Sequence, residues 1–262
     1  MHVNRPIPFI VFSDLDGTLL DHHDYSFDAA RPALAALRAA GVPVVLATSK
    51  TGAEVRVVQA DLDLTDCPAI VENGAGVIWP DADRTDDDSA YRDIRRALAA
   101  LDPDLRARFR GFGDLGAEAV AQVTGLAPDA ARAACARQFS EPGLWDGTAE
   151  ARDDFCAVLA ENGIHARQGG RFLTLLHGRT KADAMAEVVQ KLRAGRSVAL
   201  GDAPNDVEML ESADIGIIIR NDNVPTLPPL TGEETGRIRR SAHPGPAGWN
   251  ACILQLLRAQ ED

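Results

Sequence analysis

Short apolar runs alternate with helical patterns through the first eighty residues of the chain. Residues 7–13 form a nearly continuous apolar run, which is typical of a strand that is covered on both faces. After it the pattern predicts a helix over residues 28–40, a strand over 43–47, a helix over 51–60 and a strand over 69–71. A parallel sheet with right-handed crossover helices produces this alternation.

The alternation returns late in the chain. It predicts helices over residues 181–192 and 204–212 and strands over 197–201 and 214–219. Residues 222–249 are rich in proline, glycine and threonine, so we expect a loop there, followed by a terminal helix over residues 250–260. Both ends of the chain therefore contribute to one α/β core.

The residues between these two stretches have a different pattern. The acidic stretch 81–88 has no apolar period, which favours a linker. The following patterns predict helices over 91–101, 118–123, 129–136 and 149–162, a strand over 137–145, and a hairpin of 163–167 and 171–176 that turns at Gly169-Gly170. We therefore expect a parallel-sheet α/β core of residues 1–83 and 178–262, with an inserted α+β domain of residues 84–177.

The composition limits the classes of function that fit. The 262 residues are 45% hydrophobic, enough for a buried core, and 27 Lys and Arg against 39 Asp and Glu give a net charge of −12. Nucleic acids and anionic membranes attract basic surfaces, so neither is expected as a partner. No apolar stretch reaches the ~18 residues of a membrane span, no signal-peptide pattern is present, and the four cysteines are scattered. We expect a soluble, cytoplasmic protein, and its oligomeric state stays open.

Two carboxylates one residue apart follow the first predicted strand, in the sequence Asp14-Leu15-Asp16-Gly17-Thr18. In an open parallel sheet, ligands bind at the carboxyl ends of the strands, where this pair is expected. Such a pair can act as nucleophile and general acid/base if a cation keeps both groups ionised, because repulsion would otherwise raise one pKa. The motif therefore indicates a catalytic site.

Hydroxyls and a lysine, in the sequence Thr48-Ser49-Lys50, stand at the end of the second predicted strand. The next helix begins with a capping-box pattern, so these groups and a helix N-terminus favour an anion site. Simple helix capping with a solvated lysine is the alternative, but the position beside Asp14 favours the anion site. Lys181 also lies in the first turn of a capped helix, where its charge opposes the helix dipole. Either a bound anion or a surface lysine placed there by chance explains it.

A second polar group follows the predicted strand over residues 197–201, in the sequence Gly201-Asp202-Ala203-Pro204-Asn205-Asp206. Asp202 matches the position of Asp14 at a strand end, whereas Asp206 can also simply favour the helix dipole. Carboxylates and an amide oxygen that converge from two strands suit a hard ion such as Mg²⁺. These strand-end groups together predict one functional site.

Taken in order, these groups resemble the four motifs of the haloacid dehalogenase-like (HAD) phosphatases. The insertion between the second and third motifs resembles the type IIB cap of that superfamily. Further segments resemble the mannosyl-3-phosphoglycerate phosphatases within it, namely residues 48–51, 72–75, 137–142, 169–172, 177–181 and 245–250. The resemblance extends from residue 9 to about residue 257 and implies a Rossmann-like parallel-sheet core with an α+β cap of the C2B type.

The resemblance implies a two-step hydrolysis of a phosphate ester. Asp14 would form an aspartyl-phosphate, and Asp16 would protonate the leaving oxygen and then activate water. The groups implied to hold the phosphoryl oxygens and adjoining parts of the substrate are Thr48, Ser49, Lys50 and Lys181.

The implied cofactor is Mg²⁺. Its implied ligands are Asp14, the main-chain carbonyl of Asp16, and Asp202, while Asn205 and Asp206 would support the site. The electrostatic clamp of metal and lysine matters as much as the nucleophile in this chemistry, because phosphate-ester hydrolysis is very slow without a catalyst.

The implied substrate is 2-O-(α-D-mannosyl)-3-phosphoglycerate, a small sugar phosphate that carries a carboxylate, and the product is the compatible solute mannosylglycerate. The cap is therefore expected to present cationic and hydroxyl groups. The candidates are Arg137, Ser140 and Arg171, with Glu141 for the sugar hydroxyls and His177 as a weaker candidate. The alternative is that the arginines are ordinary strand-face residues and that Glu141 pairs with one of them. His22 and His23 are expected in an exposed loop.

Other functions are compatible with the same motifs. The glucosyl analogue or another small sugar phosphate is the first alternative, since only a few polar contacts distinguish an axial from an equatorial hydroxyl. A phosphomutase would share the aspartyl-phosphate chemistry, and a non-catalytic sugar-phosphate sensor would share the binding site. The presence of both Asp14 and Asp16 argues against the sensor.

Overall fold

The computed structural model describes residues 7, 9–80 and 87–259. Within these ranges the larger sheet is made of β1 (Ile10–Ser13), β2 (Val44–Ala47), β3 (Ala69–Val71), β4 (Gly76–Ile78), β9 (Ser197–Gly201), β10 (Ile215–Arg220) and β11 (Ile238–Pro244). The strand order is β11-β10-β9-β1-β2-β3-β4, and all neighbours are parallel except the antiparallel pair β3 and β4. Strand β1 therefore lies at the centre of a parallel sheet, as its apolar run predicts.

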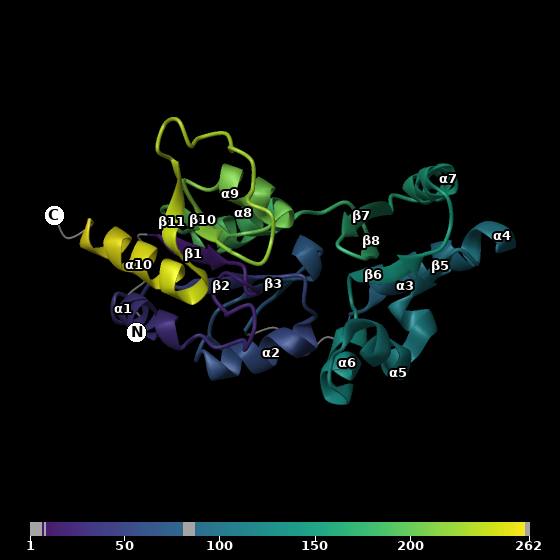
Figure 1. Cartoon of the computed structure of the whole chain (residues 1–262), viewed down its shortest axis with the longest axis horizontal. Coiled ribbons are helices and arrows are strands. Elements are labelled where there is room, and N and C mark those ends of the chain that lie inside the picture. Colours follow the sequence, from purple (N-terminus) through teal and green to yellow (C-terminus); the bar gives the residue numbers. More distant parts are fainter. Residues whose placement is uncertain (1–6, 8, 81–86, 260–262) are drawn as a thin grey trace.

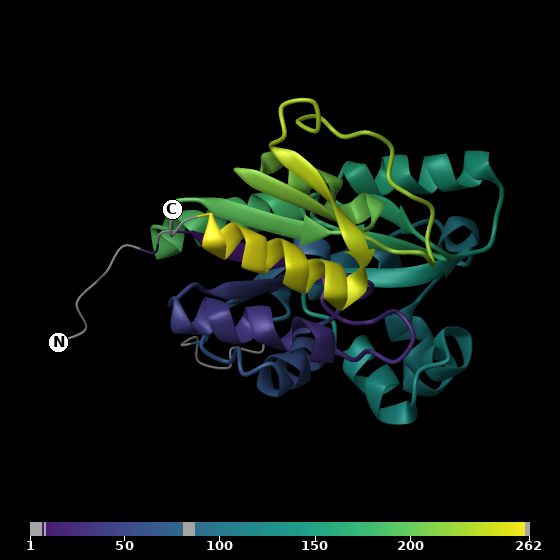
Figure 2. The ribbon, with the colours of Figure 1, turned by 60° about the vertical axis from the view of Figure 1, so that its left-hand side comes forward.

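Helices cover both faces of this sheet. One face carries α1 (Arg31–Ala39), α2 (Gly52–Asp61) and α10 (Gly245–Arg258), and the other carries α8 (Lys181–Leu192) and α9 (Val207–Ser212). The side chains of β1 alternate between the faces, since Val11 packs in the first cluster and Ile10 and Phe12 in the second. Figure 2 shows α1 and α10 side by side on their face of the sheet.

Residues 89–176 form a second unit, which we call the cap. Its antiparallel sheet has the order β5-β6-β8-β7, with β5 (Phe109–Gly111), β6 (Ser140–Trp145), β7 (His165–Gly169) and β8 (Phe172–Leu176). The helices of the cap are α3 (Ser89–Ala99), α4 (Pro103–Arg106), α5 (Phe112–Thr124), α6 (Pro128–Cys135) and α7 (Ala149–Ala160). Helices α3 and α7 pack on the sheet through Leu98 and Phe155. The cap lies beside the core, at the right of Figure 1.

Most of the predicted elements are confirmed, and three have the same bounds as the prediction. These are β3, β9 and α8. The hairpin at Gly169-Gly170 is also present, as β7 and β8. Of the predicted linker over residues 81–88, residues 81–86 lie outside the described ranges.

The loop predicted over residues 222–249 is wrong, because β11 and the first turns of α10 lie within it. Strand β11 is at the sheet edge and exposes Arg239 and Arg240, so it lacks the apolar run of a central strand. Helix α10 begins at Gly245-Pro246, and a proline is tolerated there because its missing N–H would have no partner within the helix.

Two predicted elements in the cap begin three or more residues away from the predicted start. The predicted strand 137–145 begins at Ser140, and the predicted helix 118–123 begins at Phe112. In this helix Gly116 has a φ of +72°, so the backbone bends where the apolar pattern is interrupted. Four short segments were absent from the sequence prediction: β4, β5, α4 and the 3₁₀ turn η2 (Glu72–Gly74). Two further 3₁₀ turns, η1 (Asp28–Ala30) and η3 (Pro204–Asp206), begin predicted helices.

Candidate active site

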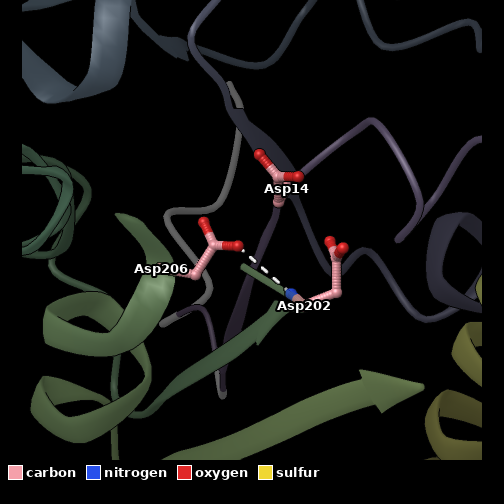
Figure 3. Close-up of side chains that lie close together, drawn as sticks. All are labelled: Asp14, Asp202 and Asp206. Carbon is pink, nitrogen blue, oxygen red and sulfur yellow. Dashed lines mark hydrogen bonds between the residues drawn. The ribbon is translucent and has the colours of Figure 1, made fainter. Parts of the chain in front are cut away.

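Loops after three neighbouring strands bring the predicted catalytic residues together. Asp14 follows β1, Thr48 follows β2 and Asp202 follows β9, and β1 lies between the other two in the sheet. Asp206, from η3, joins the group across from Asp14. Figure 3 shows the side chains of Asp14, Asp202 and Asp206 close together at this end of the sheet.

One buried lysine faces three buried carboxylates. One oxygen each of Asp14, Asp202 and Asp206 lies within 4.8 Å of the others. The Lys181 ammonium donates to Asp14 Oδ1 and to Asp206 Oδ1, at 2.7 Å each. Burial, followed by the charge of Asp206, raises the pKa of Asp14 to about 8, although Lys181 lowers it. The cluster of three carboxylates and one ammonium is therefore short of positive charge.

The charge of Lys181 itself is secure. Burial opposes its ammonium, but Asp14 and Asp206 raise the pKa of Lys181 above its ordinary value. These two carboxylates also compensate for a lysine in the first turn of α8, where the helix dipole is unfavourable.

Neighbouring residues orient the other carboxylates of the cluster. Thr18 donates its hydroxyl to Asp202 Oδ1 at 2.5 Å, and Asn221 donates its amide to Asp202 Oδ2 at 2.8 Å. Asp206 Oδ2 accepts hydrogen bonds from the N–H groups of Asp202 and Ala203, both at 3.1 Å. These bonds fix the direction of each carboxylate before any ligand arrives.

Asp16 forms an ion pair with Lys50. Lys50 donates to Asp16 Oδ2 at 2.7 Å, and its ammonium lies 5.6 Å from the ring centre of Tyr25. Burial lowers the pKa of Lys50 but Asp16 raises it, and the net shift is upward. The other oxygen, Asp16 Oδ1, is buried and has no hydrogen-bond partner among the described residues.

This donor set fits a divalent cation. Three carboxylates offer oxygen ligands to a hard ion, and a cation would supply the positive charge that Asp14 lacks. The unpartnered oxygen of Asp16 agrees with a site that is completed by a ligand.

A cavity of about 500 Å³ lies between the core and the cap. Its core side includes Ser49, Lys50, Asn73 and Asn205. The polar residues on its cap side are Arg137, Arg167, Gln168 and Thr174. The volume is in the range of small-molecule sites, and the lining supplies positive charge.

Of the four main cap candidates, Arg137 lines the cavity, and the other three are not in its lining. Ser140 is buried and donates to Glu72 at 2.7 Å. Glu141 is fully buried and accepts hydrogen bonds from Arg95 and from the N–H of Gly113.

Arg171 and the histidines are not among the residues that line the cavity. Arg171 donates to the carbonyl of Val123. His22 and His23 are exposed in the loop after β1, as expected, and His177 lies 3.4 Å from the carbonyl of Ala90.

The sequence prediction missed several residues of the site. Asn221 directly follows β10, so the strand-end rule that found Asp14 applies to it as well. Arg167 and Gln168 lie on β7 and line the cavity, but the sequence pattern of this exposed hairpin does not indicate a cavity. Glu72 belongs to the segment 72–75 that carries part of the family resemblance, but it was given no role, because its contact with Arg137 joins core and cap.

The sequence pattern of the haloacid dehalogenase-like hydrolases matches residues 11–98 and 149–226 of the chain. The chain therefore belongs to this family, as its motifs predicted.

A relative resembles the chain over nearly its full length. This is the glucosyl-3-phosphoglycerate/mannosyl-3-phosphoglycerate phosphatase of Persephonella marina, which is 33% identical over an aligned length of 271. The alignment covers 96% of this chain and 98% of the relative. Family and relative together identify the chain as a phosphoric monoester hydrolase.

Solved structures confirm the predicted fold class. The sucrose-phosphatase of Synechocystis sp. PCC6803, in complex with sucrose and phosphate, has a TM-score of 0.62 at 19% identity and covers 95% of this chain and 98% of its own. A sugar phosphatase of HAD subclass IIB has a TM-score of 0.61 at 15% identity, with coverages of 96% and 98%. The described part of this chain contains no helix that is both long and apolar enough to cross a membrane.

Proposed function

We propose that the chain is a magnesium-dependent phosphomonoesterase that converts 2-O-(α-D-mannosyl)-3-phosphoglycerate to mannosylglycerate. The observation that carries the proposal is the cluster of Asp14, Asp202 and Asp206 around Lys181, close to a cavity with cationic groups on its cap side. The Persephonella marina relative is named for glucosyl- and mannosyl-3-phosphoglycerate, which supports this class of substrate.

In the proposed mechanism, Asp14 attacks the phosphorus through Oδ2, because Oδ1 is engaged by Lys181. The new P–O bond makes an aspartyl-phosphate while the bond to the glycerate oxygen breaks. Asp16 donates a proton to this leaving oxygen through Oδ1, since Oδ2 is held by Lys50. Asp16 then accepts a proton from the water that hydrolyses the aspartyl-phosphate and releases phosphate.

The cation, proposed to be Mg²⁺, would be held by Asp14, by the main-chain carbonyl of Asp16 and by Asp202, and it would supply positive charge to the phosphoryl oxygens. Asp206 fits a supporting role because Lys181 and main-chain amides already engage it. Asn205 donates to Asn73 and is also proposed to support the site. The groups proposed to hold the phosphoryl oxygens and adjoining substrate are Thr48, Ser49, Lys50 and Lys181.

The cap is proposed to select the rest of the substrate. Arg137 and Arg167 line the cavity and suit the glycerate carboxylate. Contacts of Ser140, Glu141 and Arg171 with substrate stay predictions that rest on the family resemblance.

The glucosyl substrate is the second candidate. It differs from the mannosyl substrate in the configuration of one hydroxyl, and the name of the Persephonella marina relative includes both sugars. A phosphatase that accepts both is compatible with the same cavity.

A phosphate-release assay tests the proposal. Mannosyl-, glucosyl- and unglycosylated 3-phosphoglycerate are compared with Mg²⁺ and with a chelator. We expect Mg²⁺-dependent release that is fastest from the glycosylated substrates. Asp14→Asn keeps the size of the side chain and should lower kcat by at least about a thousandfold, because the nucleophile is lost. Release from no phosphate ester by the wild-type protein, or full activity of Asp14→Asn, would contradict the mechanism.

A further inference from the structure

The turn η2, which follows β3, has an unusual backbone. Glu72, Asn73 and Gly74 have φ values of +52°, +61° and +92°, so three successive residues adopt the left-handed conformation. Side chains disfavour this region, and such a backbone persists where the surroundings hold it in place. The contacts of the turn show what holds it.

On the core side, the turn is attached to the predicted phosphate-binding segments. The N–H of Glu72 donates to the carbonyl of Lys50 and the N–H of Asn73 donates to the carbonyl of Thr48, both at 2.9 Å. Gly74 packs so closely on Thr180 that a Cβ atom there would lie 2.1 Å from its carbonyl carbon. The turn therefore contacts the residues around both Lys50 and Lys181.

On the cap side, the Glu72 carboxylate binds the segment that enters β6. Oε1 accepts from the N–H of Gln138 at 2.9 Å, and Oε2 accepts from the N–H of Phe139 at 3.1 Å and from the hydroxyl of Ser140 at 2.7 Å. The Nε of Arg137 lies 3.4 Å from Oε2. Glu72 is fully buried. Among the described residues, the groups that donate to its carboxylate all belong to the cap.

Arg137 continues this connection to the cavity. Arg137 is one of the residues that line the cavity, and its guanidinium donates to the hydroxyl of Ser140 and to the carbonyl of Ser49. Burying a carboxylate is costly unless its hydrogen bonds are satisfied. The hydrogen bonds that satisfy Glu72 join two parts of the chain that are far apart in sequence. One side chain thus links the phosphate-binding loop to the substrate-selecting wall.

We propose that Glu72 is a positioning residue that holds the cap strand β6 and Arg137 in register with the phosphate-binding loop. The inference rests on the proposed function, because it assigns the phosphoryl group to the core and the glycerate or sugar to the cap. Glu72 acts through Arg137 and the 138–140 backbone and does not touch the reacting atoms.

The test replaces Glu72 by glutamine. Glu72→Gln keeps the shape but turns an NH₂ group toward backbone donors, so at least one hydrogen bond to a charged group is lost. We expect kcat/KM for mannosyl-3-phosphoglycerate to fall at least about tenfold, mainly because KM rises. The fall in kcat/KM for p-nitrophenyl phosphate should be several-fold smaller. Hydrogen exchange at the amides of Gln138 and Phe139 should accelerate.

Two further variants make the test decisive. Asp114→Asn is the matched control, because Asp114 pairs with Arg95 and Arg106 inside the cap, so it weakens the cap without touching its link to the core. It should not produce the difference between the two substrates. Ser140→Ala removes a single donor to Glu72. It should produce a smaller difference in kcat/KM between the two substrates, in the same direction. The test therefore remains possible if Glu72→Gln does not fold.

The inference would be overturned if Glu72→Gln and Ser140→Ala lowered kcat/KM equally for both substrates. It would also be overturned if Asp114→Asn produced the same difference between the two substrates as Glu72→Gln. Failure of the proposed function is a different result, because the wild-type protein would then release no phosphate from mannosyl-3-phosphoglycerate.

Discussion

At the scale of single residues, the charge of the site depends on where one lysine is placed. Lys181 begins α8, and its ammonium reaches both Asp14 and Asp206. Buried charges need partners, so the lysine and the two carboxylates stabilise one another in a place where none would be stable alone. Asp202 instead accepts hydrogen bonds from Thr18 and Asn221, and one of its oxygens lies within 4.8 Å of an Asp14 oxygen, which allows the proposed cation to bind both carboxylates.

The cap arginines offer a test at this scale. Arg167 lines the cavity and lies 3.9 Å from Glu208 of the core, whereas Arg171 donates to the carbonyl of Val123. We expect Arg167→Ala to raise KM for mannosyl-3-phosphoglycerate at least about tenfold, because a charged hydrogen bond to the carboxylate is lost, with a smaller effect from Arg171→Ala. Steady-state kinetics of both variants measure this difference.

The comparison of Arg167→Ala with Arg171→Ala shows whether the cavity lining or the family resemblance better identifies the arginine that binds the substrate carboxylate. A larger effect from Arg171→Ala would favour the assignment that came from the family resemblance over the one that came from the cavity. Activity on p-nitrophenyl phosphate, which has no carboxylate, serves as the control for both variants.

At the scale of elements, the turn η2 tolerates few substitutions, because its residues have positive φ values and Gly74 packs against Thr180. Gly74→Ala places a side chain in the left-handed region and against Thr180, whereas Gly41→Ala, at the end of α1, meets no atom within 4 Å. We expect Gly41→Ala to lower the free energy of unfolding by about 1 kcal/mol and Gly74→Ala by more than about 2 kcal/mol. Urea unfolding of the two variants measures the difference, and equal losses would show that the contact with Thr180 is unimportant.

Elements with a strong apolar period could be predicted from the sequence, and those defined by pairing could not. Strand β9 and helix α8 carry their own patterns, and their bounds were predicted correctly. Strand β11 is mostly exposed at the sheet edge, and β5 has only three residues, so each exists because a neighbouring strand pairs with it. Such pairing is tertiary and leaves little trace in the local sequence.

At the scale of the whole molecule, the same distinction separates the two sides of the site. The core side could be predicted because parallel strands bring their carboxyl ends to one edge, which places Asp14, Thr48 and Asp202 together. The cap side depends on packing between distant segments. Glu141, for example, pairs with Arg95, forty-six residues away, and no local pattern indicates that partner.

The balance of charge in the folded protein leads to a final prediction. The chain has a net charge of −12, and three of its carboxylates are buried together around one lysine. A cation that binds only the folded state stabilises it, by about 2.7 kcal/mol at a hundred times its dissociation constant. For a protein of this size, that stabilisation corresponds to a rise in Tm of roughly 5–10 °C, measured by calorimetry with Mg²⁺ added.

Two variants decide whether this rise comes from the cluster. Asp202→Asn removes one proposed ligand and should abolish most of the rise. Asp222→Asn should retain it, because Asp222 is exposed and pairs with Arg220 outside the cluster. Since Mg²⁺ also screens the repulsion among surface carboxylates, a rise that is the same in both variants would assign the stabilisation to the overall negative charge. A rise that is lost only in Asp202→Asn would place the cation among the buried carboxylates, where the proposed mechanism needs it.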